Sequence, residues 1–141
     1  MRLPHARARA RIHAMPPTAK LFILLGAVAG AAGVALGAFG AHALKARLAP
    51  DMLAVWQTAV QYHFWHALGL IAIGILIALT LPGSTTLKWA GWLMVAGLVL
   101  FSGSLYALAF TDARWLGAVT PFGGVAWIGA WVLLAVAVWK S

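Results

Sequence analysis

The chain has 141 residues, of which 64% are hydrophobic and only 9% are charged. This number of charged side chains is too small to cover the surface of a soluble domain of this size. The composition therefore excludes a soluble globular protein and predicts an integral membrane protein. The sequence has no cysteine and two acidic residues, Asp51 and Asp112. Disulfides, iron–sulfur clusters and thiolate zinc sites are therefore excluded, and paired-carboxylate catalysis has no candidates within the apolar segments.

The first segment, residues 1–19, is rich in arginine and has no acidic residue. We expect a disordered cytoplasmic tail that touches anionic lipids. Met15 is a second candidate start, and a mitochondrial transit peptide fits the composition less well. A cleaved secretory signal is disfavoured because the apolar run after Lys20 is long enough to span the membrane. The net charge of +8 does not indicate nucleic-acid binding, because half of the basic residues lie in the first twenty positions and no aromatic residue accompanies them there.

Residues 20–141 are predicted to form one membrane domain. Residues 21–41 have no charged or hydrogen-bonding side chain, and as a helix they span roughly 31 Å, about the thickness of the hydrocarbon core. The alternating pattern of a membrane barrel is absent, so we predict an all-α membrane protein that forms an antiparallel bundle of four transmembrane helices. The predicted spans are residues 20–42, 57–80, 88–110 and 115–139.

Basic residues predict the orientation of the bundle, because short cytoplasmic flanks accumulate lysine and arginine. Four spans place the two termini and the loop at 82–88 on one side, which carries seven basic residues against three on the other. Both termini are therefore expected to be cytoplasmic. If the chain starts at Met15, the count is three against three and no longer favours either orientation.

Span one carries a stripe of glycines at intervals of four, three, four and three residues. This spacing averages about 3.5 residues and keeps the glycines on one face of a packed helix. Small residues let another backbone approach closely, so the stripe predicts close helix packing. The spacing leaves open whether the partner is another span or a second protomer. The glycines are Gly26, Gly30, Gly33, Gly37 and Gly40.

Polar residues interrupt or end each span, although polar groups are costly in hydrocarbon and therefore imply a purpose. Because successive helices alternate in direction, these residues are expected to meet in one leaflet, the outer one. His63 and His66 lie three residues apart and are expected to share a helix face. The candidate binding residues are His42, Tyr62, His63, His66, Ser102, Ser104, Tyr106, Thr120, Pro121, Gly123 and Gly124.

Each of these motifs also has a structural interpretation. Ser102 and Ser104 can join neighbouring helices by hydrogen bonds. The sequence Thr120-Pro121 predicts a break or kink, and the glycines that follow would let a helix, a water or a ligand reach the freed backbone. Histidines on neighbouring helices would offer two axial ligands to haem, whereas a zinc site would lack its third protein ligand.

Tryptophans at the ends of the spans predict an aromatic belt at the two membrane interfaces. Trp56 and Trp115 are expected near one interface, and Trp89 and Trp139 near the other. The remaining four tryptophans lie deeper, where packing or lipid contact is expected.

Four motifs together carry a resemblance to a known family. They are Ala38-Phe39-Gly40-Ala41-His42, Thr58-Ala59-Val60-x-Tyr62 with His66-Ala67-Leu68, Phe101-Ser102-Gly103-Ser104-Leu105-Tyr106, and Thr120-Pro121-x-Gly123-Gly124. In this order, over about residues 19–139, they resemble the small bacterial inner-membrane family catalogued as domain of unknown function 423, which is related to eukaryotic transmembrane protein 256. The resemblance implies four spans and a place in the bacterial inner membrane, but it brings no activity.

The missing catalytic acids, the small size and the packing glycines predict a non-enzymatic protein. Our leading hypothesis is an accessory, assembly or stabilising subunit of a larger membrane complex, with other membrane proteins or further copies of the chain as partners. The alternative is a module that binds or conducts a small molecule or ion through a polar site in the outer leaflet. A haem- or quinone-linked redox protein is the third hypothesis. We predict no metal and no cofactor, with haem as the exception that the histidines leave open.

Overall fold

The computed structural model describes residues 15–79 and 84–141. Within these residues all regular structure is helical, and no strand is present. Four segments are long and apolar enough to cross a membrane, which confirms the predicted all-α, four-helix membrane architecture. Most of the basic tail, residues 1–14, and the turn residues Pro82 and Gly83 lie outside the described part. The four segments are Pro17–Leu44, Pro50–Leu79, Thr85–Thr111 and Arg114–Trp139.

The first two spans form a hairpin. Helix α1 (Pro17–Phe39) begins with a proline in its first turn, where the missing amide would have no partner, and it continues as the π-helical turn η1 (Gly40–Leu44). Residues 17–19, which the sequence assigned to the tail, therefore belong to the first span. Helix α2 (Pro50–Leu79) begins seven residues before its predicted start, with Pro50 and Asp51 in the first turn.

The other two spans form a second antiparallel pair. The third span consists of α3 (Thr85–Gly97), the π-helical turn η2 (Leu98–Gly103) and α4 (Ser104–Thr111). It ends at Asp112, which adopts the left-handed conformation with φ of 51°. The fourth span consists of the 3₁₀ turn η3 (Arg114–Ala118) and α5 (Thr120–Trp139).

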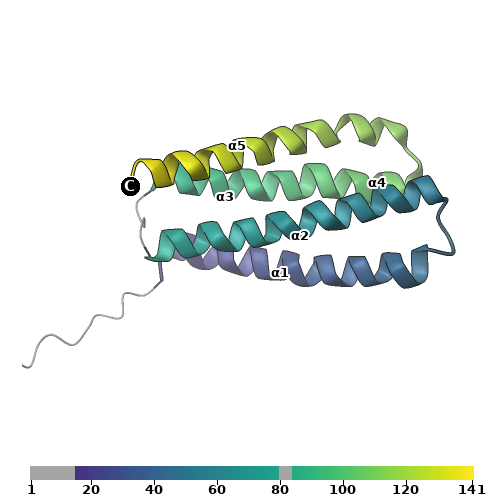
Figure 1. Cartoon of the computed structure of the whole chain (residues 1–141), viewed down its shortest axis with the longest axis horizontal. Coiled ribbons are helices and arrows are strands. Elements are labelled where there is room, and N and C mark those ends of the chain that lie inside the picture. Colours follow the sequence, from purple (N-terminus) through teal and green to yellow (C-terminus); the bar gives the residue numbers. More distant parts are fainter. Residues whose placement is uncertain (1–14, 80–83) are drawn as a thin grey trace, which may run out of the picture.

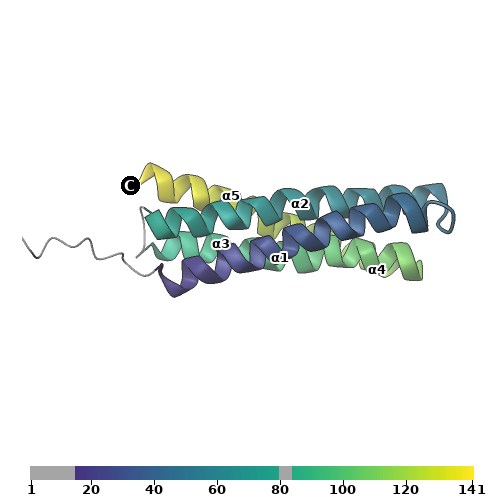
Figure 2. The same cartoon turned by 90° about the horizontal axis from the view of Figure 1, so that it is seen from below.

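The bundle is built from these two tightly packed pairs. Helix α1 lies along α2, and α5 lies along α3 and η2 (Figures 1 and 2). Helix α2 joins the pairs by packing against α3, η2 and α4, whereas its backbone stays farther from α5. The main core lies between the pairs and includes Phe22, Leu70, Ile73, Leu87, Met94 and Trp127.

Glycines set the close contact between α1 and α2. A Cβ atom added at Gly26 would lie 2.6 Å from Cγ1 of Ile71 and 2.8 Å from the carbonyl oxygen of Ala67, and one added at Gly40 would lie 2.6 Å from the Trp56 indole. Added Cβ atoms at Gly33 and Gly37 would also contact α2, at 3.5 and 3.3 Å. The partner of the stripe is therefore another span of the same chain.

Gly30 is the exception to the predicted stripe. A Cβ atom added there would meet no atom within 4 Å. Gly30 therefore lies at the edge of the stripe, outside the close contact with α2.

The four tryptophans of the predicted aromatic belt differ in exposure. Trp89, Trp115 and Trp139 are exposed, as interface anchors should be. Trp56 is only 2% exposed, and its Nε1 donates a hydrogen bond of 3.0 Å to the carbonyl of Leu36. It is therefore a packing residue, around which Leu44 and Ala109 form a second small core.

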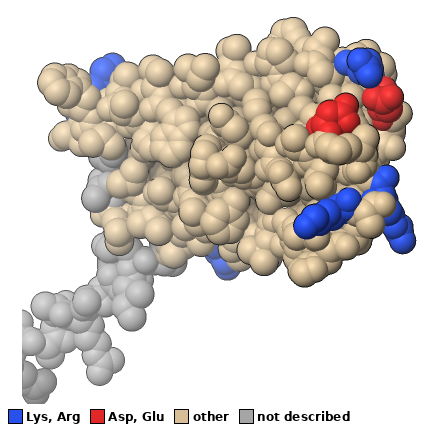
Figure 3. All heavy atoms as spheres, turned by 45° about the vertical axis from the view of Figure 1, so that its right-hand side comes forward, with Lys and Arg blue, Asp and Glu red and all other residues tan. Residues whose placement is uncertain are grey.

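Charged side chains gather at one end of the bundle, formed by residues 45–49 and 112–113, which we call the loop end (Figure 3). Lys45, Arg47 and Asp51 are exposed there. Arg114 lies 3.9 Å from Asp112 in an exposed pair. Solvent-exposed pairs of this kind contribute little to stability. Charged side chains are costly in hydrocarbon, so the loop end is expected to lie outside it.

Candidate functional site

His63 uses both nitrogens of its ring to connect three spans. Its Nε2 lies 2.8 Å from the carbonyl oxygen of Ala29 in α1, and its Nδ1 lies 3.1 Å from the hydroxyl of Tyr106 in α4. A carbonyl only accepts, so Nε2 carries the proton and Nδ1 accepts from Tyr106. Both ring nitrogens are therefore engaged, and the neutral tautomer with its proton on Nε2 fits these two partners.

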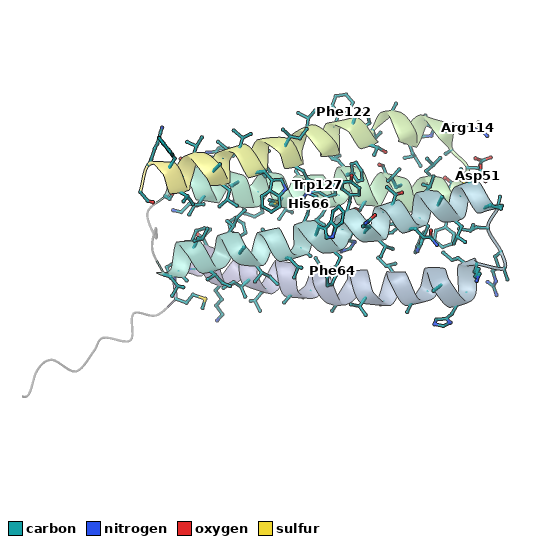
Figure 4. All side chains as sticks on the ribbon, in the orientation of Figure 1. Asp51, Phe64, His66, Arg114, Phe122 and Trp127 are labelled. Carbon is teal, nitrogen blue, oxygen red and sulfur yellow. The ribbon has the colours of Figure 1, made fainter. Side chains whose placement is uncertain are left out.

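His66 is also bonded through both nitrogens, but with the opposite tautomer. Its Nδ1 donates to the carbonyl of Tyr62, 2.7 Å away and one turn earlier in α2, and its Nε2 accepts from Nε1 of Trp131 at 3.2 Å. The imidazole stacks on Trp127 with ring centroids 3.6 Å apart and planes at 6° (Figure 4). His66 therefore joins α2 to α5.

Trp127 is held on its other edges by the third span. Its Nε1 donates to the carbonyl of Met94 at 3.2 Å, and its indole lies against Gly97, where any side chain would overlap it. Trp127 is 3% exposed. An aromatic residue with a paired N–H can be buried at low cost, and here it fixes the gap between α2 and α5.

His63 and His66, which were expected to share a helix face, contact different helices. Helical residues three apart differ by about 60° in direction, and α2 lies between two neighbours at this point. His63 turns toward α1 and α4, while His66 turns toward α5. The two imidazoles consequently belong to different helix contacts and do not face a common ligand position.

The serines of the third span connect it to both sides. Ser102 is fully buried in η2 and donates to the carbonyl of Ala59 in α2 at 3.0 Å. Ser104 lies 2.8 Å from the hydroxyl of Thr120 at the start of α5, and it donates to the carbonyl of Phe101 at 2.9 Å. These contacts match the interhelical interpretation of the serines.

The segment at 120–124 begins a helix and does not kink one. Pro121 lies in the first turn of α5, after the 3₁₀ turn η3, where its missing amide breaks no hydrogen bond. The predicted break is thus a change of helix type. Backbone atoms of Phe101 in η2 lie against Gly123 so closely that a side chain there would overlap them. The sequence left open whether a helix, a water or a ligand reaches these glycines, and in the structure it is the third span that packs against Gly123.

His42 lies apart from the other candidates. It is exposed on η1, and among the described residues it has no hydrogen-bond or ring partner. His66 also departs from the expected grouping, because it lies near the middle of α2 while Ser104, Tyr106 and Thr120 lie in the half toward the loop end.

Open grooves flank the polar residues. The groove between α2 and α5 has a volume of about 430 Å³ and is lined mainly by aromatic side chains: Tyr62, His66, Phe101, Gly124, Trp127, Ile128 and Trp131. A second groove of about 170 Å³ lies between α1 and α2 near the loop end. Its lining is Gly37, Gly40, Ala41, Trp56, Gln57, Val60 and Gln61. Both grooves are predominantly apolar.

Several residues of the site were not predicted from the sequence. Trp127 and Trp131, four residues apart on α5, supply the indoles that hold His66. The four-residue spacing of these tryptophans is visible in the sequence, but the sequence does not indicate that His66 is their partner. The carbonyl of Ala29 carries no side-chain signal at all.

The arrangement gives little support to a metal centre. In the described part of the chain, no three side chains from histidine, aspartate or glutamate come together. Each nitrogen of His63 and His66 already has a hydrogen bond, so ligation of haem iron would require one of these bonds to break. No acid orients either imidazole, and therefore the geometry provides no serine or histidine triad.

Comparisons with known proteins agree with the four-span architecture. The family model described as "Protein of unknown function (DUF423)" matches residues 36–124. The chain is 52% identical over 121 residues to the UPF0382 membrane protein YwdK of Bacillus subtilis (strain 168), covering 86% of this chain and 98% of that protein. It is 48% identical over 121 residues to the UPF0382 membrane protein SH2409 of Staphylococcus haemolyticus (strain JCSC1435), covering 86% and 97%.

A third relative, the UPF0382 membrane protein SSP2132 of Staphylococcus saprophyticus, is 47% identical over 121 residues, covering 86% of this chain and 98% of that protein. No solved structure matches the chain. The family model matches more than half of the chain, and the chain therefore belongs to the membrane protein family DUF423.

Proposed function

We propose that the protein is a non-enzymatic accessory subunit that stabilises or assembles a larger complex in the bacterial inner membrane. The observation that supports this role is that the buried polar side chains form hydrogen bonds with one another or with the backbone, which we call the closed network. In the part of the chain that the structure describes, no buried side-chain nitrogen or oxygen lacks a hydrogen-bond partner.

A closed network leaves few groups for chemistry or transport. The polar atoms of His63, His66 and Ser102 join one helix to the next. Polar residues that serve an ion or substrate path usually face a water-filled cavity and keep groups free for the passenger. Here the network fixes the shape of the bundle, and the capacity for further contacts lies on its outer surface.

The groove between α2 and α5 supports a second candidate, a binding site for a small apolar molecule. Its lining offers aromatic faces, and Tyr62 is partly exposed there. Ligand sites are typically apolar concavities with a few polar groups, which fits this lining. Purified protein that retains such a molecule, and loses it when Trp131 is replaced by alanine, would favour this candidate over the subunit.

We place both termini in the cytoplasm. Within the described residues each end of the bundle carries three basic side chains, but the loop end also carries Asp51 and Asp112. The four arginines at positions 2–11 give the terminal side its excess of basic residues. Labelling of an introduced Lys45→Cys from the outside of intact cells tests this orientation, and labelling only after the membrane is opened contradicts it.

The accessory role is tested by purification of the untagged chain from native membranes in a mild detergent. Native gels and mass spectrometry should find it comigrating with larger membrane proteins. The Tyr106→Phe variant is the matched control, because it changes an internal contact only and should keep the same partners. Migration solely as a monomer or as a homo-oligomer would overturn the proposal.

A further inference from the structure

Two glutamines on the outside of α2 have no hydrogen-bond partner among the residues that the structure describes. Gln57 and Gln61 are exposed, lie one helical turn apart and line the groove between α1 and α2. No hydrogen bond connects either amide to another described residue. They differ in this from the exposed Thr58, whose hydroxyl donates to the carbonyl of Ala54 at 3.0 Å.

The position of Gln61 along α2 makes this exposure costly. The 30 residues of α2 extend about 45 Å, whereas the hydrocarbon core is about 30 Å thick. A centred helix therefore projects about 7 Å at each end, and Gln61, about 16 Å from its first residue, lies about 9 Å inside the hydrocarbon. Lipid tails cannot replace the hydrogen bonds that water would give this amide.

We propose that the groove between α1 and α2 is a self-association surface that binds a second copy of the same chain. A carboxamide both donates and accepts hydrogen bonds, so it can pair with its own copy. A two-fold axis places the same side chains opposite one another, and Gln57 and Gln61 then satisfy their counterparts. The groove between α1 and α2 has Gly37 and Ala41 in its lining, and these small residues leave room for the partner to approach.

Charges beside the groove fit the same partner. Lys45 and Arg47 are exposed in the loop that joins the two helices of the groove, and Asp51 is exposed in the first turn of α2. None of the three has an ion pair with another described residue. Two copies related by a two-fold axis bring both signs of charge to the same end of the interface, which permits pairing between copies.

Cysteine crosslinking tests the surface directly, because the chain has no cysteine of its own. An Ala41→Cys variant in native membranes should form a covalent dimer with a short bis-maleimide reagent, and mass spectrometry should find only this chain in it. Phe122→Cys is the matched control, since Phe122 is exposed on α5, away from α1 (Figure 4). Equal crosslinking of both variants, or none of Ala41→Cys, would overturn the proposal.

A second experiment measures how much the two glutamine amides contribute to dimerisation. Singly labelled protein in lipid vesicles should show two copies per particle by photobleaching, and the Gln57→Leu, Gln61→Leu double variant should raise the dimer dissociation constant at least about tenfold. Thr58→Val, an exposed polar change on the same helix, should leave it unchanged. Wild-type protein that is monomeric in vesicles, or a double variant that dimerises as before, contradicts the inference.

The result is separable from the proposed function. The crosslink and the vesicle assay need no other protein, so they hold or fail by themselves. A dimer with no larger partner in native membranes would support this surface and overturn the accessory role. A larger complex that contains one copy of the chain would do the reverse.

Discussion

Tyr106 donates a hydrogen bond to Nδ1 of His63 across 3.1 Å, and Nε2 of the same ring donates to the carbonyl of Ala29. One imidazole thereby connects α4, α2 and α1. The Tyr106 ring also packs on Trp56, with centroids 4.6 Å apart, so the hydroxyl and the ring have separate roles.

Replacing Tyr106 with phenylalanine should therefore remove the hydrogen bond and keep the packing. The Nδ1 of His63 loses its donor, and the free energy of unfolding should fall by about 1 kcal/mol. An SDS titration of the protein in detergent micelles measures the change. Tyr106→Ala serves as the comparison and should cost more, because the contact with Trp56 is lost too. Equal stability of the wild type and Tyr106→Phe would contradict a stabilising role for the bond.

The glycine stripe of α1 offers a matched pair of substitutions. Gly26→Ala should destabilise the bundle by about 1–3 kcal/mol, because the new methyl group overlaps the α2 backbone at Ala67 and must push the helices apart. Gly30→Ala meets open space, and it should stabilise the helix by about 0.5–1 kcal/mol. Thermal unfolding in the same detergent compares the two. The same sign for both variants would be inconsistent with this packing.

Substitutions of His66 separate its stacking from its hydrogen bonds. His66→Phe keeps a flat ring against Trp127 but leaves the N–H of Trp131 without its acceptor, which should cost about 1–2 kcal/mol. His66→Ala also removes the ring and opens a cavity, so its cost should reach about 3 kcal/mol or more. Denaturant titration gives both values. Identical losses in the two variants would show that stacking contributes nothing.

The hydrogen bonds at both nitrogens of each imidazole lead to a prediction about haem absorption. Haem added to the purified protein should give no Soret band typical of histidine ligation, because each nitrogen of His63 and His66 is already bonded within the protein. Absorption spectra with increasing haem check this. A band that appears with the wild type and disappears in His66→Phe would revive the redox hypothesis.

The sequence alone determined the class and the course of the chain. Runs of apolar residues of membrane length, separated by Pro82-Gly83 and Asp112, require four helices, since hydrocarbon leaves the backbone no other way to satisfy its hydrogen bonds. The spacing of the five glycines from Gly26 to Gly40 also predicted a closely packed face, because helical periodicity depends on local geometry, although a Cβ atom at Gly30 would meet open space.

Only the tertiary structure decided which neighbour each polar side chain meets. His63 and His66 are three residues apart, yet one bonds to α1 and α4 and the other to α5, because α2 lies between the two helix pairs at that depth. The same packing buries Trp56, exposes His42 and leaves Gln61 facing outward. Periodicity gives the direction of a side chain from its own helix axis, whereas the partner in that direction depends on how the four helices pack.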